Sequence, residues 1–254
     1  MNKTSEKIPF AIEISRMIEL LAGQIYPTPF ALLRENVQNA FDAILLRQHA
    51  GQRFDAKIDV TIEPDMVRVM DNGIGMTWDD LRTHFWRAGS SSKNTDDARA
   101  AGVVGTFGIG AMANFGIAEE LLVESESAMT GERNLCMANR STLSVTEDCI
   151  KRSPQRSKGE PGTIVTAKIE PEKLIDVEEA KTYITQFVAY LPIVVNLNGR
   201  LISKQSIDTS VPPIQAPSWT VRKSRVDLGD GFATDIDLSG AVTGDLRVAL
   251  SNIE

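Results

Sequence analysis

The sequence contains little cysteine and little histidine. Its 254 residues include two of each, and the cysteines, Cys136 and Cys149, form no CxxC pair. This excludes a disulfide framework and leaves few ligands for Cys/His zinc sites or histidine-based catalytic triads. A reduced, cytoplasmic compartment is the expected location of such a chain.

Long apolar runs and an excess of basic residues are also missing. No run approaches the ~20 apolar residues that span a membrane. Charged Glu13, Arg16 and Glu19 interrupt the N-terminal segment, so no signal peptide is expected. The 27 basic and 34 acidic residues give a net charge of −7, which argues against nucleic-acid binding through overall basicity without excluding a local basic groove.

Hydrophobic periodicity predicts both helices and strands. Amphipathic helices are expected at 11–22, 30–49 and 172–190, and a shorter helix at 77–86. Strands are expected at 57–63, 66–70, 119–126, 133–139, 142–147 and 162–169, and 194–197 and 201–202 flank the hairpin signal Asn198-Gly199. Residues 87–105 show no regular pattern, and loops this long in a compact domain are usually functional lids or disordered.

The composition changes after residue 203. Prolines 212, 213 and 217 indicate a linker, and 218–254 holds short alternating runs. We therefore expect one domain over 1–205, a linker over 206–217, and the beginning of a second, truncated domain over 218–254.

The helix expected at 30–49 carries a polar stripe. With Glu35 at 0°, Asn39 falls at about 40° and Asp42 at about −20°. The apolar residues fall on the opposite side, between about 140° and 240°: Leu33, Val37, Ala40, Phe41 and Ile44. The stripe fits either a solvated face with weak side-chain pairing or one wall of a polar pocket, where a carboxylate activates water and an amide oxygen ligates Mg²⁺.

Glycine-rich segments follow two of the predicted elements. Asp71-Asn72-Gly73-Ile74-Gly75-Met76 comes directly after a strand, where glycines let the backbone bend and a flat ligand approach. Gly105-Thr106-Phe107-Gly108-Ile109-Gly110 precedes a helix-like run, and backbone N–H groups at a helix start suit a phosphate. It is neither a Walker A loop nor a Rossmann fingerprint. Taken alone, the first segment fits a plain turn better than a ligand site, and the second is equally consistent with a tight loop that binds nothing.

The order and spacing of these segments are more specific than any one of them. The chain carries Glu35-x-x-x-Asn39-x-x-Asp42-Ala43, then Asp71-x-Gly73-x-Gly75, then the long polar loop, then Gly105-x-x-Gly108-x-Gly110, then Gly162-Thr163. This arrangement resembles the four-part signature of the GHKL ATP-binding superfamily, which includes gyrase-type topoisomerases, heat shock protein 90 chaperones, sensor histidine kinases and MutL proteins. The motifs are most similar to those of heat shock protein 90, although Leu21-Ala22-Gly23-Gln24-Ile25 with Pro29 is similar to the MutL entry helix. Leu46 and Arg47 lie where chaperones often carry a lysine.

The resemblance implies a fold and a set of residue roles. The fold is a two-layer α/β sandwich of the Bergerat type, with a mixed, mostly antiparallel sheet and helices on one face. Glu35 is the implied catalytic base and Asn39 the implied Mg²⁺ ligand. Asp71 accepts the adenine amino group with the support of Thr163. The complete set of implied nucleotide-binding residues is Asn39, Asp42, Asp71, Gly73, Gly75, Met76, Gly105, Gly108, Ile109, Gly110 and Thr163.

The function that the resemblance implies is Mg²⁺-dependent ATP hydrolysis that drives lid closure and dimerisation, as in heat shock protein 90. ATP and ADP are the expected ligands and a homodimer the expected assembly, with an unidentified client protein, no membrane, and nucleic acid only through further domains. The fragment itself hydrolyses ATP weakly if a further cation comes from the next domain. The alternatives are a nucleotide-sensing interaction module, a MutL- or gyrase-like DNA-transaction ATPase, and a histidine kinase domain, against which Asp42 and the segment after residue 200 argue.

Overall fold

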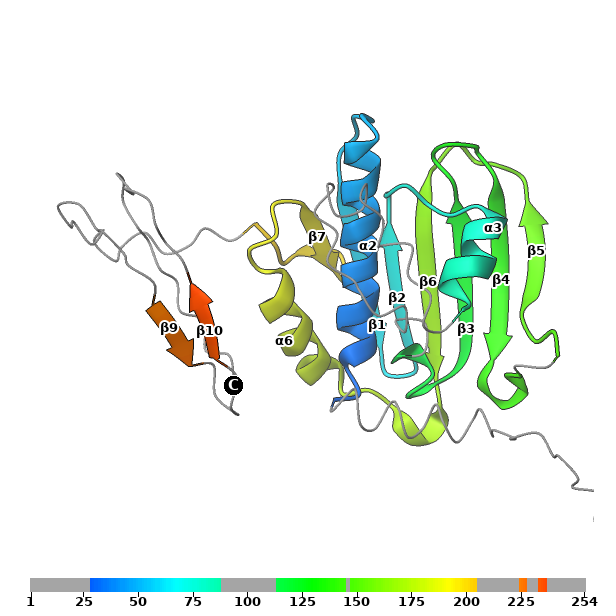
Figure 1. Ribbon diagram of the computed structural model, residues 1–254. Coiled ribbons are helices and arrows are strands. Elements are labelled where there is room, and N and C mark those ends of the chain that lie inside the picture. The colour runs from blue at the N-terminus through cyan, green and yellow to red at the C-terminus, as the bar shows by residue number, and fades with distance from the viewer. Residues whose placement is uncertain (1–27, 88–112, 145–146, 205–223, 228–232, 237–254) are drawn as a thin grey trace, which may run out of the picture. The chain divides into compact units, whose positions relative to one another are not determined.

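The computed structural model describes residues 28–87, 113–144, 147–204, 224–227 and 233–236 (Figure 1). The chain divides into two compact units, Met1–Gln205 and Ser206–Glu254. In the second unit, strands β9 (Ser224–Asp227) and β10 (Ala233–Ile236) pair antiparallel. The other described elements belong to the first unit. The linker and the truncated second domain stay predictions.

An eight-stranded sheet forms one layer of the first unit. Its strands are β1 (Lys57–Glu63), β2 (Met66–Asp71), β3 (Ala118–Glu126), β4 (Arg133–Asn139), β5 (Lys151–Gln155), β6 (Gly162–Ile169), β7 (Val194–Leu197) and β8 (Arg200–Leu201). They follow the order β5-β4-β3-β6-β2-β1-β7-β8. All neighbouring strands in the sheet run antiparallel except β1 and β7, which are parallel.

The residues in the turns account for two hairpins of the sheet, β1–β2 and β7–β8. Glu63 pairs with Met66 across the two-residue turn at Pro64-Asp65. Asn198 and Gly199 adopt φ angles of +46° and +79°, the left-handed backbone that a two-residue hairpin turn requires and that these residue types tolerate best. The Asn198 side chain also binds β1, because its Oδ1 accepts from the N–H of Ile62 at 2.9 Å. Both predicted hairpins are confirmed.

Helices cover one face of the sheet, as Figure 1 shows. They are α2 (Ala31–His49), α3 (Trp78–Asp80) with the π-helical turn η1 (Leu81–Phe85), and α6 (Val177–Val188). Two 3₁₀ turns also form: η3 (Arg140–Thr142) follows β4, and η4 (Pro171–Lys173) precedes α6. The helix predicted at 77–86 therefore forms as α3 and η1. Thr77 caps it in a reciprocal arrangement with Asp80.

The core lies between the helices and this face of the sheet. The strands alternate, so that residues such as Ile58, Val69 and Val123 are buried against the helices. Leu33 and Ile44 of α2 are fully buried opposite them, as the helical periodicity predicts. The two-layer α/β fold with a mixed, mostly antiparallel sheet and helices on one face is confirmed.

One predicted strand is wrong, and one predicted helix is shorter than expected. No strand forms over the described part of 142–147, because Asn139 Oδ1 accepts from the N–H of Ser141 and starts the turn η3. The neighbour of β4 is instead β5, whose five residues are all exposed and therefore show no alternation. The helix predicted at 172–190 begins only at Val177, because Asp176 caps it by accepting from the N–H groups of residues 178 and 179.

The helix expected at 11–22, the glycine segment at 105–110 and most of the polar loop at 87–105 lie outside the described residues. Among the residues that the structure describes, no helix has the length and apolar content needed to cross a membrane.

Candidate functional site

The polar stripe of α2 lies partly inside the protein. Asp42 is 1% exposed and accepts a hydrogen bond from Gln38 Nε2 at 2.9 Å. Asn39 is half-buried. The Glu35 side chain is 25% exposed and pairs with Arg34 Nη2 at 2.9 Å. The stripe is therefore not a fully solvated face, and its burial increases from Glu35 toward Asp42.

Asp71 ends β2 with a buried carboxylate. Its Oδ1 accepts from the N–H of Gly73 at 2.7 Å. Burial raises the pKa of Asp71 to about 7, although hydrogen bonds from the backbone of Gly73 and Thr163 and the charge of Arg47 act in the opposite direction. A buried carboxylate with a shifted pKa at the end of a strand is a frequent feature of functional sites.

Two glycines allow the chain to turn closely after Asp71. A Cβ atom on Gly73 would lie 2.6 Å from Ala43 of α2, so only glycine lets this turn pack on the helix. Gly75 has a φ of +64°, and a Cβ there would lie 1.9 Å from the carbonyl oxygen of Glu126. The spacing Asp-x-Gly-x-Gly is thus explained by contacts within the protein, whether or not a ligand is bound.

The turn after Asp71 is joined to α2 by main-chain contacts. The N–H of Ile74 donates to the carbonyl of Ala43 at 2.9 Å, and Arg47 Nη1 donates to the carbonyl of Asn72 at 2.7 Å. These bonds place Asp42 and Ala43 beside the turn. Asn39 and Glu35 follow at about 5 and 10 Å farther along the helix axis.

Thr163, the second residue of β6, lies directly opposite Asp71. Its hydroxyl lies 2.9 Å from Ser125 Oγ. Ser125 Oγ also accepts from the N–H of Met76 at 2.8 Å. One buried hydroxyl on β3 therefore joins Thr163 to the segment that holds Gly75 and Met76.

Sequence reasoning missed Ser125 and the contact made by Arg47. A signal for Ser125 exists, because it continues the inward-facing series Leu121 and Val123 and is polar where an apolar residue is expected. In the sequence, Arg47 is visible only as a departure from the chaperone pattern. In the structure its guanidinium holds the turn after Asp71 and stacks 4.2 Å from the ring centroid of Phe54.

The second glycine segment, with Gly105, Gly108, Ile109 and Gly110, lies outside the described residues. The chain resumes at Ala113 and Asn114. Asn114 is fully buried and forms a reciprocal amide pair with Asn36 of α2, with N–O distances of 2.7 and 3.3 Å. The chain that follows the glycine segment in sequence is thus bound directly to α2.

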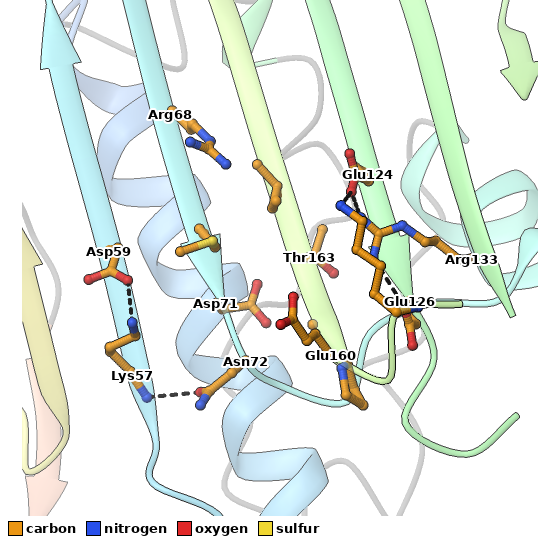
Figure 2. Close-up of a pocket in the computed structure, with 15 residues that line it drawn as sticks. Lys57, Asp59, Arg68, Asp71, Asn72, Glu124, Glu126, Arg133, Glu160 and Thr163 are labelled. Carbon is orange, nitrogen blue, oxygen red and sulfur yellow. Dashed lines mark hydrogen bonds and ion pairs between the residues drawn. The ribbon is translucent and has the colours of Figure 1, made fainter. Parts of the chain in front are cut away.

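A cavity of about 470 Å³ opens on the face of the sheet opposite α2. Figure 2 shows it with α2 behind the strands. It reaches Asp71 and Thr163 at the strand ends, but most of its lining is charged. Several of these charges neutralise one another in pairs, such as Lys57 with Asp59 at 2.7 Å. The cavity does not include Glu35, Asn39 or Asp42, so we place the candidate site on the helix side of the sheet.

Comparison with known proteins assigns the family. The model described as "Histidine kinase-, DNA gyrase B-, and HSP90-like ATPase" matches residues 28–169, more than half of the chain. The described part of that stretch contains α2, the turn after Asp71, and β6 with Thr163. The chain belongs to this family of ATPases.

Curated relatives narrow the similarity to heat shock protein 90 chaperones. The chain is 33% identical to the chaperone protein HtpG of Rhodopseudomonas palustris over 144 residues, which are 50% of this chain and 23% of that protein. It is 28% identical to HtpG of Streptomyces coelicolor over 187 residues, which are 66% of this chain and 28% of that protein. For HtpG of Buchnera aphidicola the identity is 23% over 247 residues, which are 89% of this chain and 39% of that protein. The chain thus spans less than half the length of these relatives, and the expected resemblance to heat shock protein 90 is confirmed.

Proposed function

We propose that the first unit binds ATP between α2 and the Asp71 end of the sheet and hydrolyses it. The observation that carries the proposal is the position of the buried Asp71 carboxylate, held beside α2 by the turn that contains Gly73. The polar stripe on α2 leads away from it over about 10 Å. That distance suits a nucleotide with its base at Asp71 and its phosphates toward Glu35.

We call the part of the site around Asp71 and Thr163 the base end, because we place the base of the nucleotide there. Its polar groups are suited to recognise a purine. The Asp71 carboxylate accepts the adenine amino group, and the Thr163 hydroxyl, oriented by Ser125, supports the same edge. Gly75 lets the backbone approach the flat base. Met76 and Asp42 complete the pocket. The family match and the chaperone relatives support this assignment of roles.

Asn39 is the residue that would hold Mg²⁺. Among the described residues no group of three or more His, Cys, Asp or Glu side chains could bind a metal ion. In nucleotide sites Mg²⁺ is commonly held by one or two protein oxygens together with phosphates and waters, so one amide oxygen such as that of Asn39 is a sufficient protein ligand. When bound, it neutralises charge on the phosphates. We assign the phosphates themselves to the backbone of Gly105, Gly108, Ile109 and Gly110 from sequence alone.

Glu35 orients and deprotonates the attacking water. In the structure its carboxylate pairs with Arg34, whose side chain is 45% exposed. An exposed pair of this kind contributes little free energy, so the carboxylate exchanges this partner for a water at low cost. General-base catalysis of this type typically contributes 10²–10⁴-fold in rate.

We further propose that hydrolysis drives a chaperone-like cycle of lid closure and homodimerisation in the complete protein. The relatives named above are chaperone proteins, which supports the assignment. Client proteins, any nucleic acid and the further catalytic cation belong to parts of the protein outside this unit.

The test removes the proposed catalytic base, Glu35, and leaves the other residues of the pocket unchanged. Glu35→Ala is expected to lower ATP turnover at least 100-fold and to leave ADP affinity within threefold, since Glu35 lies at the end of the stripe away from Asp71. Phosphate release and isothermal titration calorimetry measure the two effects. Glu179→Ala, an exposed carboxylate on α6, is the control and should change neither. Equal turnover in the Glu35 variant, or no ADP binding by the unmodified chain, contradicts the proposal.

A further inference from the structure

Glu126 is a buried carboxylate on the face of the sheet opposite α2. It ends β3, and its side chain is 2% exposed in the wall of the cavity shown in Figure 2. Residues 157–160, just before β6, cover it. A carboxylate buried to this extent requires partners that satisfy both of its oxygens.

Four hydrogen bonds satisfy this carboxylate. One oxygen accepts from Ser157 Oγ at 2.7 Å and from the N–H of Gly159 at 2.8 Å. The other accepts from the N–H of Lys158 and from Arg133 Nη1, both at 2.9 Å. Three of the four donors belong to residues 157–159. The Glu126 side chain therefore holds three consecutive residues of this loop.

The main chain of Glu126 contacts the candidate nucleotide site. Its carbonyl oxygen lies against Gly75, where any Cβ atom would approach to 1.9 Å. Glu126 pairs with Gly162 in the β3–β6 ladder. Gly162 in turn packs on the Asp71 carbonyl, where a Cβ would lie at 2.1 Å.

We propose that Glu126 is a positioning residue for the base end of the nucleotide site. Its carboxylate fixes residues 157–159, and this fixes Gly162 and Thr163 against Asp71. It touches neither the ligand nor the reacting atoms. The inference rests on the proposed function, because the consequence of the positioning is nucleotide affinity.

A matched neighbour separates this role from ordinary charge pairing. Glu124 lies two residues earlier on the same face and also forms an ion pair with Arg133. Its side chain is 29% exposed, and its contact with the loop is the Lys158 ammonium at 4.0 Å. Removing either charge disturbs Arg133, but only removal of the Glu126 charge releases the main chain of the loop.

The experiment compares Glu126→Gln with Glu124→Gln in the 254-residue chain. ADP affinity is measured by calorimetry, and KM and kcat by phosphate release. For Glu126→Gln we expect ADP affinity to fall and KM to rise at least tenfold, with kcat at saturating ATP within twofold, because the loop lies at the base end and not at the phosphates. Glu124→Gln is expected to stay within threefold in all three quantities.

Ser157→Ala provides a second variant that removes one donor and leaves the charge in place. We expect it to weaken ADP binding by two- to fivefold with an unchanged kcat, and it tests the inference if Glu126→Gln fails to fold. Unchanged ADP affinity in a folded Glu126→Gln or in Ser157→Ala overturns the inference. Equal loss in Glu124→Gln and Glu126→Gln also overturns it. Absence of ADP binding by the unmodified chain would instead overturn the proposed function.

Discussion

The negative charge on Asp71 is unfavourable for folding, and in the proposed function the same carboxylate binds the adenine amino group. The carboxylate accepts backbone N–H groups and lies within the electrostatic influence of Arg47, yet burial outweighs both and its pKa rises from 3.8 to about 7. A buried carboxylate with a raised pKa is a frequent feature of functional sites, in agreement with the role that we propose for Asp71. Its cost appears in the stability of the protein.

The pH dependence of stability measures this cost. The folded state binds the Asp71 proton more tightly than the unfolded chain does, so between about pH 4 and pH 7 the free energy of unfolding falls as pH rises. The contribution of this group is about 4 kcal/mol at most, from roughly three units of pKa. Urea unfolding at pH 4 and pH 8 measures most of it. Asp71→Asn should lose this pH-dependent part of the free energy of unfolding, and the exposed control Asp79→Asn should keep it. The same change of unfolding free energy with pH in all three proteins would disprove the assignment.

Gly75 provides a prediction that does not depend on any ligand. Gly75→Ala combines a φ of +64° with a Cβ 1.9 Å from a backbone oxygen, so we expect it to lower the free energy of unfolding by about 3 kcal/mol or more. Gly51 has a φ of +78° and open space around its Cβ position. Gly51→Ala should lower the free energy of unfolding by only about 1 kcal/mol, the cost of the left-handed backbone conformation alone. Equal losses in chemical denaturation would show that the contact with Glu126 is unimportant.

At the scale of elements, α2 is tied to distant parts of the chain by polar groups as well as by its apolar side. The Asn36–Asn114 amide pair is completely buried and joins residues 78 positions apart. Buried polar pairs of this kind specify one arrangement of the elements that they join. Here the arrangement is that of α2 relative to the chain that follows the second glycine segment.

A double-mutant cycle tests this link. Asn36→Leu and Asn114→Leu each remove both hydrogen bonds of the buried amide pair and should cost about 1–3 kcal/mol. The double variant should cost less than the sum, because it leaves neither amide behind. Thermal and urea unfolding of the four proteins give the coupling energy. Strict additivity would mean that the two amides act independently.

The sequence allowed α2, the strands with an inward apolar face, and both hairpins to be predicted. These elements have strong local signals: a 3.6-residue period, a 2-residue period, or Asn198-Gly199. It did not allow β5 to be predicted, because every residue of that strand is exposed at the sheet edge. The same limit applies to Ser125 and Glu126, whose roles depend on strand pairing between residues nearly 40 positions apart.

At the scale of the whole molecule, the folding unit is longer than the family match. The match ends at residue 169, but β1 pairs in parallel with β7, from Lys57 opposite Val194 to Val60 opposite Leu197. Helix α6 buries Ala180, Ile184 and Val188 in the same core. The part after residue 169 therefore completes the domain.

Truncation tests this conclusion. A chain that ends at residue 204 should unfold cooperatively on heating, whereas one that ends at residue 169 should lose the β1–β7 pairing and the core contribution of α6. We expect the shorter chain to show no cooperative transition in circular dichroism and to aggregate. A comparable melting temperature for both chains would show that the β1–β7 half of the sheet is dispensable.

The outermost strand, β5, has a further consequence. Its sequence is Lys151-Arg152-Ser153-Pro154-Gln155, and all five residues face solvent. An open sheet edge can recruit strands from other molecules and start aggregates, and charged residues and proline are the usual protection. Lys151 and Arg152 repel an identical edge, and Pro154 offers no N–H group to it. This edge strand therefore carries the residue types that oppose edge-to-edge association of separate molecules.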